Sequence, residues 1–189
     1  MFLLSVALLS LLPFPWGSAE PAVSERWHAW PVTRVFPAAL AGASPSGARV
    51  TYLLAGVAPE APCRVALQPA AAAMLPRCLT ALRATYTDST QTFVVTVGVA
   101  VLDGPTPPVR AGGRPPTVRP VAFPGGPAER FGEAQYVTGA VAASGGPYTV
   151  LTAAGYADGR PYQREGGTEP RLGAAATQLA QALHKALTR

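Results

Sequence analysis

Charged side chains are scarce in this sequence, and lysine is nearly missing. Charged residues make up 13% of the 189 positions, and among the 15 basic residues only Lys185 is a lysine. The hydrophobic share of 49% excludes a typical charge-rich disordered protein, although 21 prolines and 19 glycines predict much irregular loop. The arginines give a net charge of +5, but they are scattered and form no nucleic-acid-binding motif. We therefore expect no nucleic-acid partner.

Residue sets for catalysis and for cofactor binding are also missing. The two histidines, His28 and His184, are far apart, and no GxSxG elbow accompanies them. The aspartates Asp88, Asp103 and Asp158 each stand at a predicted turn, where a structural role is the default. The sequence contains no phosphate-binding loop, dinucleotide fingerprint or metal-binding histidine motif. It predicts no catalytic residue, no metal site and no cofactor.

Long apolar runs are limited to the N-terminus. Residues 1–12 are apolar and uncharged, and the small residues at 17–19 would suit signal cleavage before Glu20. The positive n-region of a signal is absent, so either the coding sequence starts further upstream or residues 1–19 remain as an N-terminal anchor. The run is shorter than the ~20 residues that a membrane-spanning helix needs. We expect a signal peptide and a secreted or cell-envelope-associated protein, with membrane association through this segment as the alternative.

Cysteine occurs only twice, at Cys63 and Cys78. An exported chain with an even cysteine count usually pairs them. The disulfide would close a loop of about 15 residues, worth roughly 3 kcal/mol in the chain-entropy model. Two buried thiols are the alternative; a metal site is not expected, because no CxxC pair or nearby histidine is present.

Residues 20–37 form a Trp/Pro-rich segment. Trp27 and Trp30 make it aromatic, while Pro31 and Pro37 prevent a long helix. The segment would either pack over the domain or lie at a membrane interface, where tryptophan is enriched. Trp27 and Trp30 are the candidate partner surface.

The strongest structural signal is a β-hairpin over residues 79–104. Alternate residues from Phe93 to Val101 are apolar and project from one face of a strand. Residues 88–90 are polar and suit a reversal before that strand. A second hairpin is predicted from residues 135–143 and 148–158, joined by a Ser-Gly-Gly-Pro turn.

Helical patterns precede and follow these hairpins. Residues 48–57 fit either a short strand or a helical turn, and residues 65–75 favour a helix interrupted by Pro69. Residues 104–127 are so rich in proline and glycine that we expect a linker, as a mobile loop or an extended crossing, and no packed element. A closing helix, capped by Thr168, would bury an apolar stripe of Leu172, Ala176, Leu179, Leu183 and Leu187.

These elements predict a single α+β domain over residues 38–189. Its fold class is a two-layer antiparallel sheet built from two β-hairpins, with helices packed on one face. The disulfide would tie the approach of the first helix to the first hairpin.

Several segments resemble uncharacterised exported proteins of high-GC actinobacteria, whose codon usage also favours arginine over lysine. The matching segments are residues 27–31 (WHAWP), 35–37 (VFP), the cysteine pair, 83–86 (RATY), 96–102 (TVGVAVL) and 155–161 (GYADGRP). The layout of helix, paired cysteines and antiparallel hairpins is also loosely similar to extracellular sensor domains of actinobacterial kinases. The resemblance implies a cell-envelope setting and assigns no chemical role to any residue.

The expected function is an exported, non-enzymatic interaction or sensing module at the cell surface, with an unknown envelope protein or ligand as its partner. One alternative is an exported hydrolase that uses Asp or Glu residues and His28, with Asp103 and Asp158 as the aspartates to test. Another is a membrane-attached accessory protein whose partner packs on the Trp27/Trp30 segment.

Overall fold

The structure is a computed structural model that describes residues 21, 25–107, 116–161 and 169–189. The leader, the cap expected at Thr168 and the middle of the 104–127 segment lie outside these residues. Among the residues that the structure does describe, no helix has the length and hydropathy that a membrane span requires.

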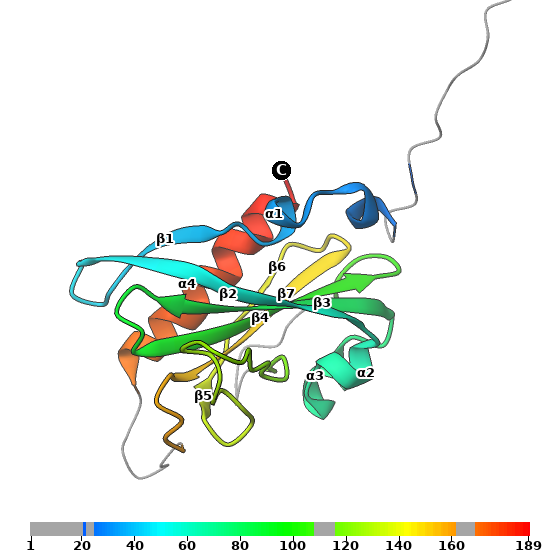
Figure 1. The fold of residues 1–189 in the computed structure, drawn as a ribbon. Coiled ribbons are helices and arrows are strands. Elements are labelled where there is room, and N and C mark those ends of the chain that lie inside the picture. Colours follow the sequence, from blue (N-terminus) through cyan, green and yellow to red (C-terminus); the bar gives the residue numbers. More distant parts are fainter. Residues whose placement is uncertain (1–20, 22–24, 108–115, 162–168) are drawn as a thin grey trace, which may run out of the picture.

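Seven strands in the described ranges pair antiparallel into one twisted sheet (Figure 1). Their spatial order is β1-β2-β3-β4-β7-β5, and β6 also pairs with β7. Mixed helices and an antiparallel sheet confirm the α+β class. The strands are β1 (Ala39–Ala43), β2 (Arg49–Ala61), β3 (Cys78–Asp88), β4 (Phe93–Leu102), β5 (Tyr136–Thr138), β6 (Val141–Ala143) and β7 (Tyr148–Tyr156).

The hairpin expected over residues 79–104 is present as β3 and β4, and β4 continues the sheet by pairing with β7. The second hairpin differs from the expected form, because its first strand is interrupted at Gly139. β6 pairs with the first part of β7, whereas β5 pairs with the last part. A Cβ at Gly139 would collide with the main-chain oxygen of Thr152, so the chain passes too close to β7 for any side chain there.

The sheet is wider than two hairpins. The ambiguous stretch 48–57 lies within β2, a 13-residue strand that joins β3 to the edge strand β1. Residues 48–57 are mainly a strand because β2 forms backbone hydrogen bonds to β3, a contact that the periodicity of the sequence could not reveal. The pairing is irregular after Leu54 and after Ala58, and Pro59 lies within the second irregular stretch. Such bulges and prolines are common devices at sheet edges.

One face of the sheet packs against α4 (Pro170–Leu187). Val95, Val97 and Val99 of β4 are buried in this first core, and all members of the predicted helical stripe are buried too. The described N-cap is Glu169, whose carboxylate accepts a hydrogen bond from the main-chain N–H of Arg171.

The N-terminal segment covers the same face as α4 (Figure 1). It contains two single turns, η1 (Arg26–Ala29) and α1 (Val32–Val35), which Pro31 separates. Val35 and Phe36 are buried in the first core, and Trp27 and Trp30 pack against it half-buried. Packing over the domain is therefore how this segment is arranged.

Helices also cover the opposite face, so the expected arrangement with helices on one face is wrong. The second core places α2 (Cys63–Ala66) and α3 (Pro69–Met74) against the residues of β4 that alternate with its valines, such as Ala100 and Leu102. β4 is apolar at both parities, so both of its faces must be buried. The single helix expected over 65–75 is two short helices, because Leu67 and Gln68 leave helical conformation to pair with the following crossing.

Residues 116–127 of the Pro/Gly-rich segment form no helix or strand, as expected of an extended crossing, but they pack across this second face and are not a loose linker. Val118 is fully buried and pairs with Leu67. The Thr85 hydroxyl donates to the Val121 main-chain oxygen at 2.7 Å, and the Val121 N–H donates to the Thr96 hydroxyl at 3.0 Å. Threonines on the sheet thus satisfy the polar groups of a segment that cannot form a regular element of its own.

The predicted disulfide is present. Cys63 at the start of α2 is bonded to Cys78 at the start of β3, with the two Cα atoms 6.1 Å apart. The bond fixes the second core's helices to the sheet, at the place where Pro76 ends the helical stretch.

Candidate ligand cleft

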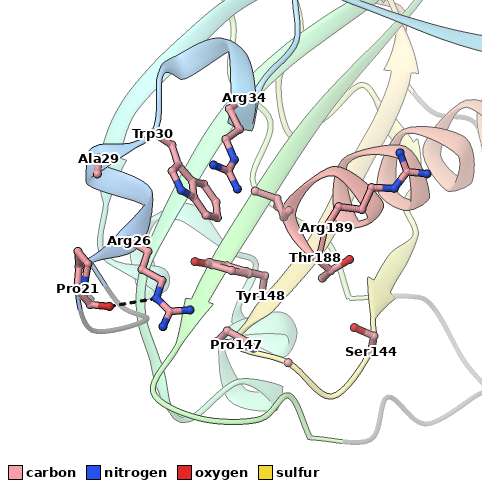
Figure 2. A pocket seen from close by; sticks show the side chains of 12 residues that line it. Pro21, Arg26, Ala29, Trp30, Arg34, Ser144, Pro147, Tyr148, Thr188 and Arg189 are labelled. Atoms are coloured by element: carbon pink, nitrogen blue, oxygen red, sulfur yellow. Dashed lines mark hydrogen bonds between the residues drawn. The ribbon is translucent and has the colours of Figure 1, made fainter. Parts of the chain in front are cut away.

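A cleft of about 690 Å³ opens where the N-terminal segment, the β6–β7 turn and the last turn of α4 meet (Figure 2). We call it the arginine cleft. The residues that give it its chemical character are Arg26, Trp30, Arg34, Ser144, Tyr148 and Arg189.

Local sequence explains how these walls form. Pro31 limits η1 and α1 to single turns, and Phe36 anchors them on the sheet, so Arg26, Trp30 and Arg34 follow one another along the rim. In the β6–β7 turn, Gly145 has a φ of 76°, a conformation that glycine adopts without strain. This turn brings the start of β7 beneath the N-terminal segment.

Two aromatic rings form the back of the cleft. The ring centroids of Trp30 and Tyr148 are 5.9 Å apart with an interplanar angle of 47°. The Arg34 guanidinium lies over the Trp30 ring at 4.1 Å from its centroid, a cation–π contact. Figure 2 shows Trp30 and Tyr148 facing each other, with Arg34 beside the indole and Arg26 beside the phenol.

The cleft is positively charged. Burial raises the pKa of the Tyr148 phenol, and the nearby positive charges of Arg26 and Arg34 partly offset that rise. Both guanidiniums therefore act on the same point in the cleft. Among the described residues that line it, none has an acidic side chain.

A serine–histidine contact lies at the lower rim. The Ser144 hydroxyl is 3.4 Å from Nε2 of His184, whose side chain is buried beneath the cleft on α4. Burial lowers the pKa of His184, and a hydrogen bond with the main chain of Tyr148 opposes this effect. In the described chain no carboxylate bonds to the imidazole, so the pair lacks the acidic third member of a catalytic triad.

The two tryptophans predicted as a partner surface both line a small hollow of about 260 Å³, and Trp30 also lines the arginine cleft. The smaller hollow is mainly apolar, with Val32 and Val57 exposed at its edge. Trp30 therefore separates the two depressions, whereas Trp27 borders only the smaller one.

The residues proposed for a hydrolase are not brought together. His28 lies 3.6 Å from Glu60, with both side chains well exposed. Asp103 pairs with Arg77 after the end of β4, and Asp158 pairs with Arg160 after the end of β7. Because β4 and β7 are antiparallel neighbours, the two aspartates lie at opposite ends of the sheet.

Sequence reasoning missed Arg26, Arg34, Ser144 and Tyr148. The stretch RWHAWPVTR did carry a signal, because an arginine, a tryptophan and an arginine stand four residues apart at 26, 30 and 34. Tyr148 had no such signal, since its role depends on the register that brings β7 beneath the N-terminal segment.

No protein-family model, curated protein or solved structure matches this chain. Within the described residues, no group of three or more His, Cys, Asp or Glu side chains is placed to hold a metal ion.

Proposed function

We propose that the protein is an exported, non-enzymatic interaction or sensing module of the cell surface, and that the arginine cleft is its ligand site. The observation that carries the proposal is the convergence of Trp30, Arg34 and Tyr148 in one concave site, from segments more than a hundred residues apart. A concave, partly apolar site with a few polar groups is the usual form of a small-ligand pocket.

The disulfide and the leader support the location. A disulfide of this kind persists in oxidising compartments, such as the outside of the cell. An actinobacterial envelope protein that is released by signal cleavage, or held by an N-terminal anchor, would satisfy both features.

The position of the cleft supports a sensing role. One wall is the N-terminal segment, which follows the leader directly in sequence and rests on the sheet through side chains such as Phe36 and Trp30. A ligand that contacts this segment and the β6–β7 turn together would stabilise the docked segment, since binding to one state shifts the equilibrium toward it. The stabilised position of the N-terminal segment would then affect any partner that contacts the N-terminus.

A titration followed by NMR tests the proposed site. ¹⁵N-labelled protein receives a small-molecule extract of the cell envelope, and the indole N–H signals are recorded. We expect the Trp30 indole signal to shift in the wild type and in the control Val65→Ala, which alters an exposed residue on α2. The shift should be lost in Tyr148→Ala or Arg34→Ala. Shifts confined to residues outside the cleft, or no shifts, would contradict the assignment.

A further inference from the structure

We infer that the arginine cleft takes a small oxyanion, a phosphate or carboxylate, carried on an apolar body such as an aromatic ring. The oxyanion would lie between Arg34 and Arg26 near the Tyr148 hydroxyl, and the apolar body against Trp30 and Pro147. This inference rests on the proposed function, because it names the ligand class of the same site.

The distribution of charged side chains in the described chain indicates that the ligand is an anion. Four arginines outside the cleft pair with a carboxylate, whereas others, such as Arg64 on α2, form no ion pair within the described residues. In the same described chain Arg34 forms no ion pair and instead lies over Trp30. A guanidinium without an ion pair, in a cleft whose described lining has no acidic side chain, favours an anion as the ligand.

The position of the Arg34 guanidinium indicates that the anion is a carboxylate or phosphate. A guanidinium that lies over an aromatic ring uses its flat face, so its N–H donors point outward in its own plane. Those donors match the fork of a carboxylate or phosphate. The described chain offers no hydrogen-bond acceptor to the Arg34 side chain.

Hydroxyl groups complete an oxyanion site. Because burial raises the pKa of the Tyr148 phenol, it stays protonated at neutral pH and is able to donate. Ser144 contributes a second hydroxyl from the opposite rim.

The apolar part of the ligand follows from the remaining walls. Trp30 and Pro147 are half-buried at the cleft, so part of their apolar surface faces it. The volume of about 690 Å³ fits within the roughly 300–1,000 Å³ of ordinary small-ligand pockets. A bare inorganic anion would leave most of this space and the apolar walls unused.

Calorimetry on the full chain tests this ligand class with matched probes. Phenyl phosphate and benzoate carry the oxyanion on a ring, phenol carries the ring without the charge, and inorganic phosphate carries the charge without the ring. We expect both ring-bearing anions to bind, inorganic phosphate at least tenfold more weakly and phenol not measurably. Added salt should weaken the binding of the anions, because the site is open to solvent.

The variants separate a built site from general charge attraction. Arg34→Gln should weaken phenyl phosphate binding at least tenfold, whereas Arg64→Gln removes the same charge from an exposed position on α2 and should leave the affinity unchanged. Tyr148→Phe serves as a second variant that keeps the ring. Equal losses in both arginine variants, or phenol binding as tightly as phenyl phosphate, would overturn the inference.

The two experiments together distinguish a wrong ligand class from a wrong binding site. If the envelope extract shifts the Trp30 signal and none of the anionic probes binds, the site stands and the ligand class is wrong. If neither the extract nor the probes affect the cleft, both proposals fail.

Discussion

At the scale of single residues, two buried polar groups fix the course of the chain. The Tyr86 hydroxyl donates to the main-chain oxygen of Pro37 at 3.0 Å and so anchors the N-terminal segment from inside the core. Burial raises the pKa of that phenol, so it remains a donor. Asp88 accepts hydrogen bonds from the N–H groups of Thr92 and Phe93 and thereby closes the β3–β4 turn. Both Tyr86 and Asp88 therefore have a structural role.

His184 gives the first prediction, on pH dependence. Burial lowers its pKa in the folded state, so below its ordinary value of 6.5 the unfolded chain binds more protons than the folded protein. This residue's contribution to stability is therefore present above pH 6.5 and is lost as the pH falls through 6.5 toward the lower folded pKa. Urea unfolding at pH 7.5 and at pH 5.0 should show a smaller loss of stability in His184→Gln than in the wild type.

The control for this measurement is His28→Gln, which alters a side chain that is 56% exposed. Comparing the two variants separates the burial of His184 from the general effect of removing a histidine. An unchanged pH dependence in His184→Gln would show that burial of this imidazole does not affect the pH dependence of stability.

At the scale of elements, β4 determines the architecture because it is apolar on both faces. Its valines from Val95 to Val101 are buried in the core that contains α4, whereas Ala100 and Leu102 are buried in the core that contains α2, α3 and the crossing segment. Gly98 lies on the second face, and a Cβ there would be 2.6 Å from Cγ2 of Val118. The small residue in the middle of this strand makes room for the crossing segment.

Gly98→Ala is therefore expected to destabilise the protein by about 1–3 kcal/mol, the usual cost of overpacking a core. The matched control is Gly173→Ala in α4, where an added Cβ meets nothing within 4 Å. That change should stabilise the protein by about 0.5–1 kcal/mol through helix propensity. Denaturant midpoints measure both, and effects of the same sign would contradict the packing of the crossing segment.

The disulfide gives a second prediction at this scale. Replacing Cys63 and Cys78 together by alanine should lower the free energy of unfolding by roughly 3 kcal/mol, because a loop of about 15 residues is released in the unfolded chain. Wild-type protein unfolded in the presence of a reductant should show the same loss. Two titratable thiols in denatured, unreduced protein would contradict the bond.

At the scale of the whole molecule, one sheet carries two large hydrophobic cores on opposite faces, and the described residues form a third, smaller cluster around Phe131. Leu183 of α4 is fully buried in the first core, and Leu67 between α2 and α3 is fully buried in the second. β4 and β7 contribute side chains to both cores, so neither layer is expected to unfold without the other.

Leu183→Ala and Leu67→Ala should each cost about 2–5 kcal/mol, because each leaves a cavity in a packed core. The substitutions lie on opposite sides of the sheet, so their effects should add in the double variant to within about 0.5 kcal/mol. Circular dichroism and tryptophan fluorescence should report one common transition in every variant. Separate transitions for the two leucines would show that the layers fold independently.

The sequence by itself determined the features that depend on neighbours along the chain. Alternation from Phe93 to Val101 predicted the hairpin, leucine spacing predicted α4, and an even cysteine count together with the expected signal peptide predicted the disulfide. The strand and the helix follow from local backbone geometry, which sets the spacing of apolar residues along the chain. The disulfide follows from the presence of only two cysteines.

Only the tertiary structure decided what covers the second face and where the arginine cleft lies. In the sequence, Val118 and Val121 belong to a Pro/Gly-rich stretch typical of linkers. In the fold, Thr85 and Thr96 of the sheet hydrogen-bond to the main chain of Val121 and hold the stretch in place. Arg34 and Tyr148 meet because β7 pairs with β4 while the N-terminal segment docks on the same face. Contacts between residues so far apart depend on sheet order and docking, and no local pattern specifies them.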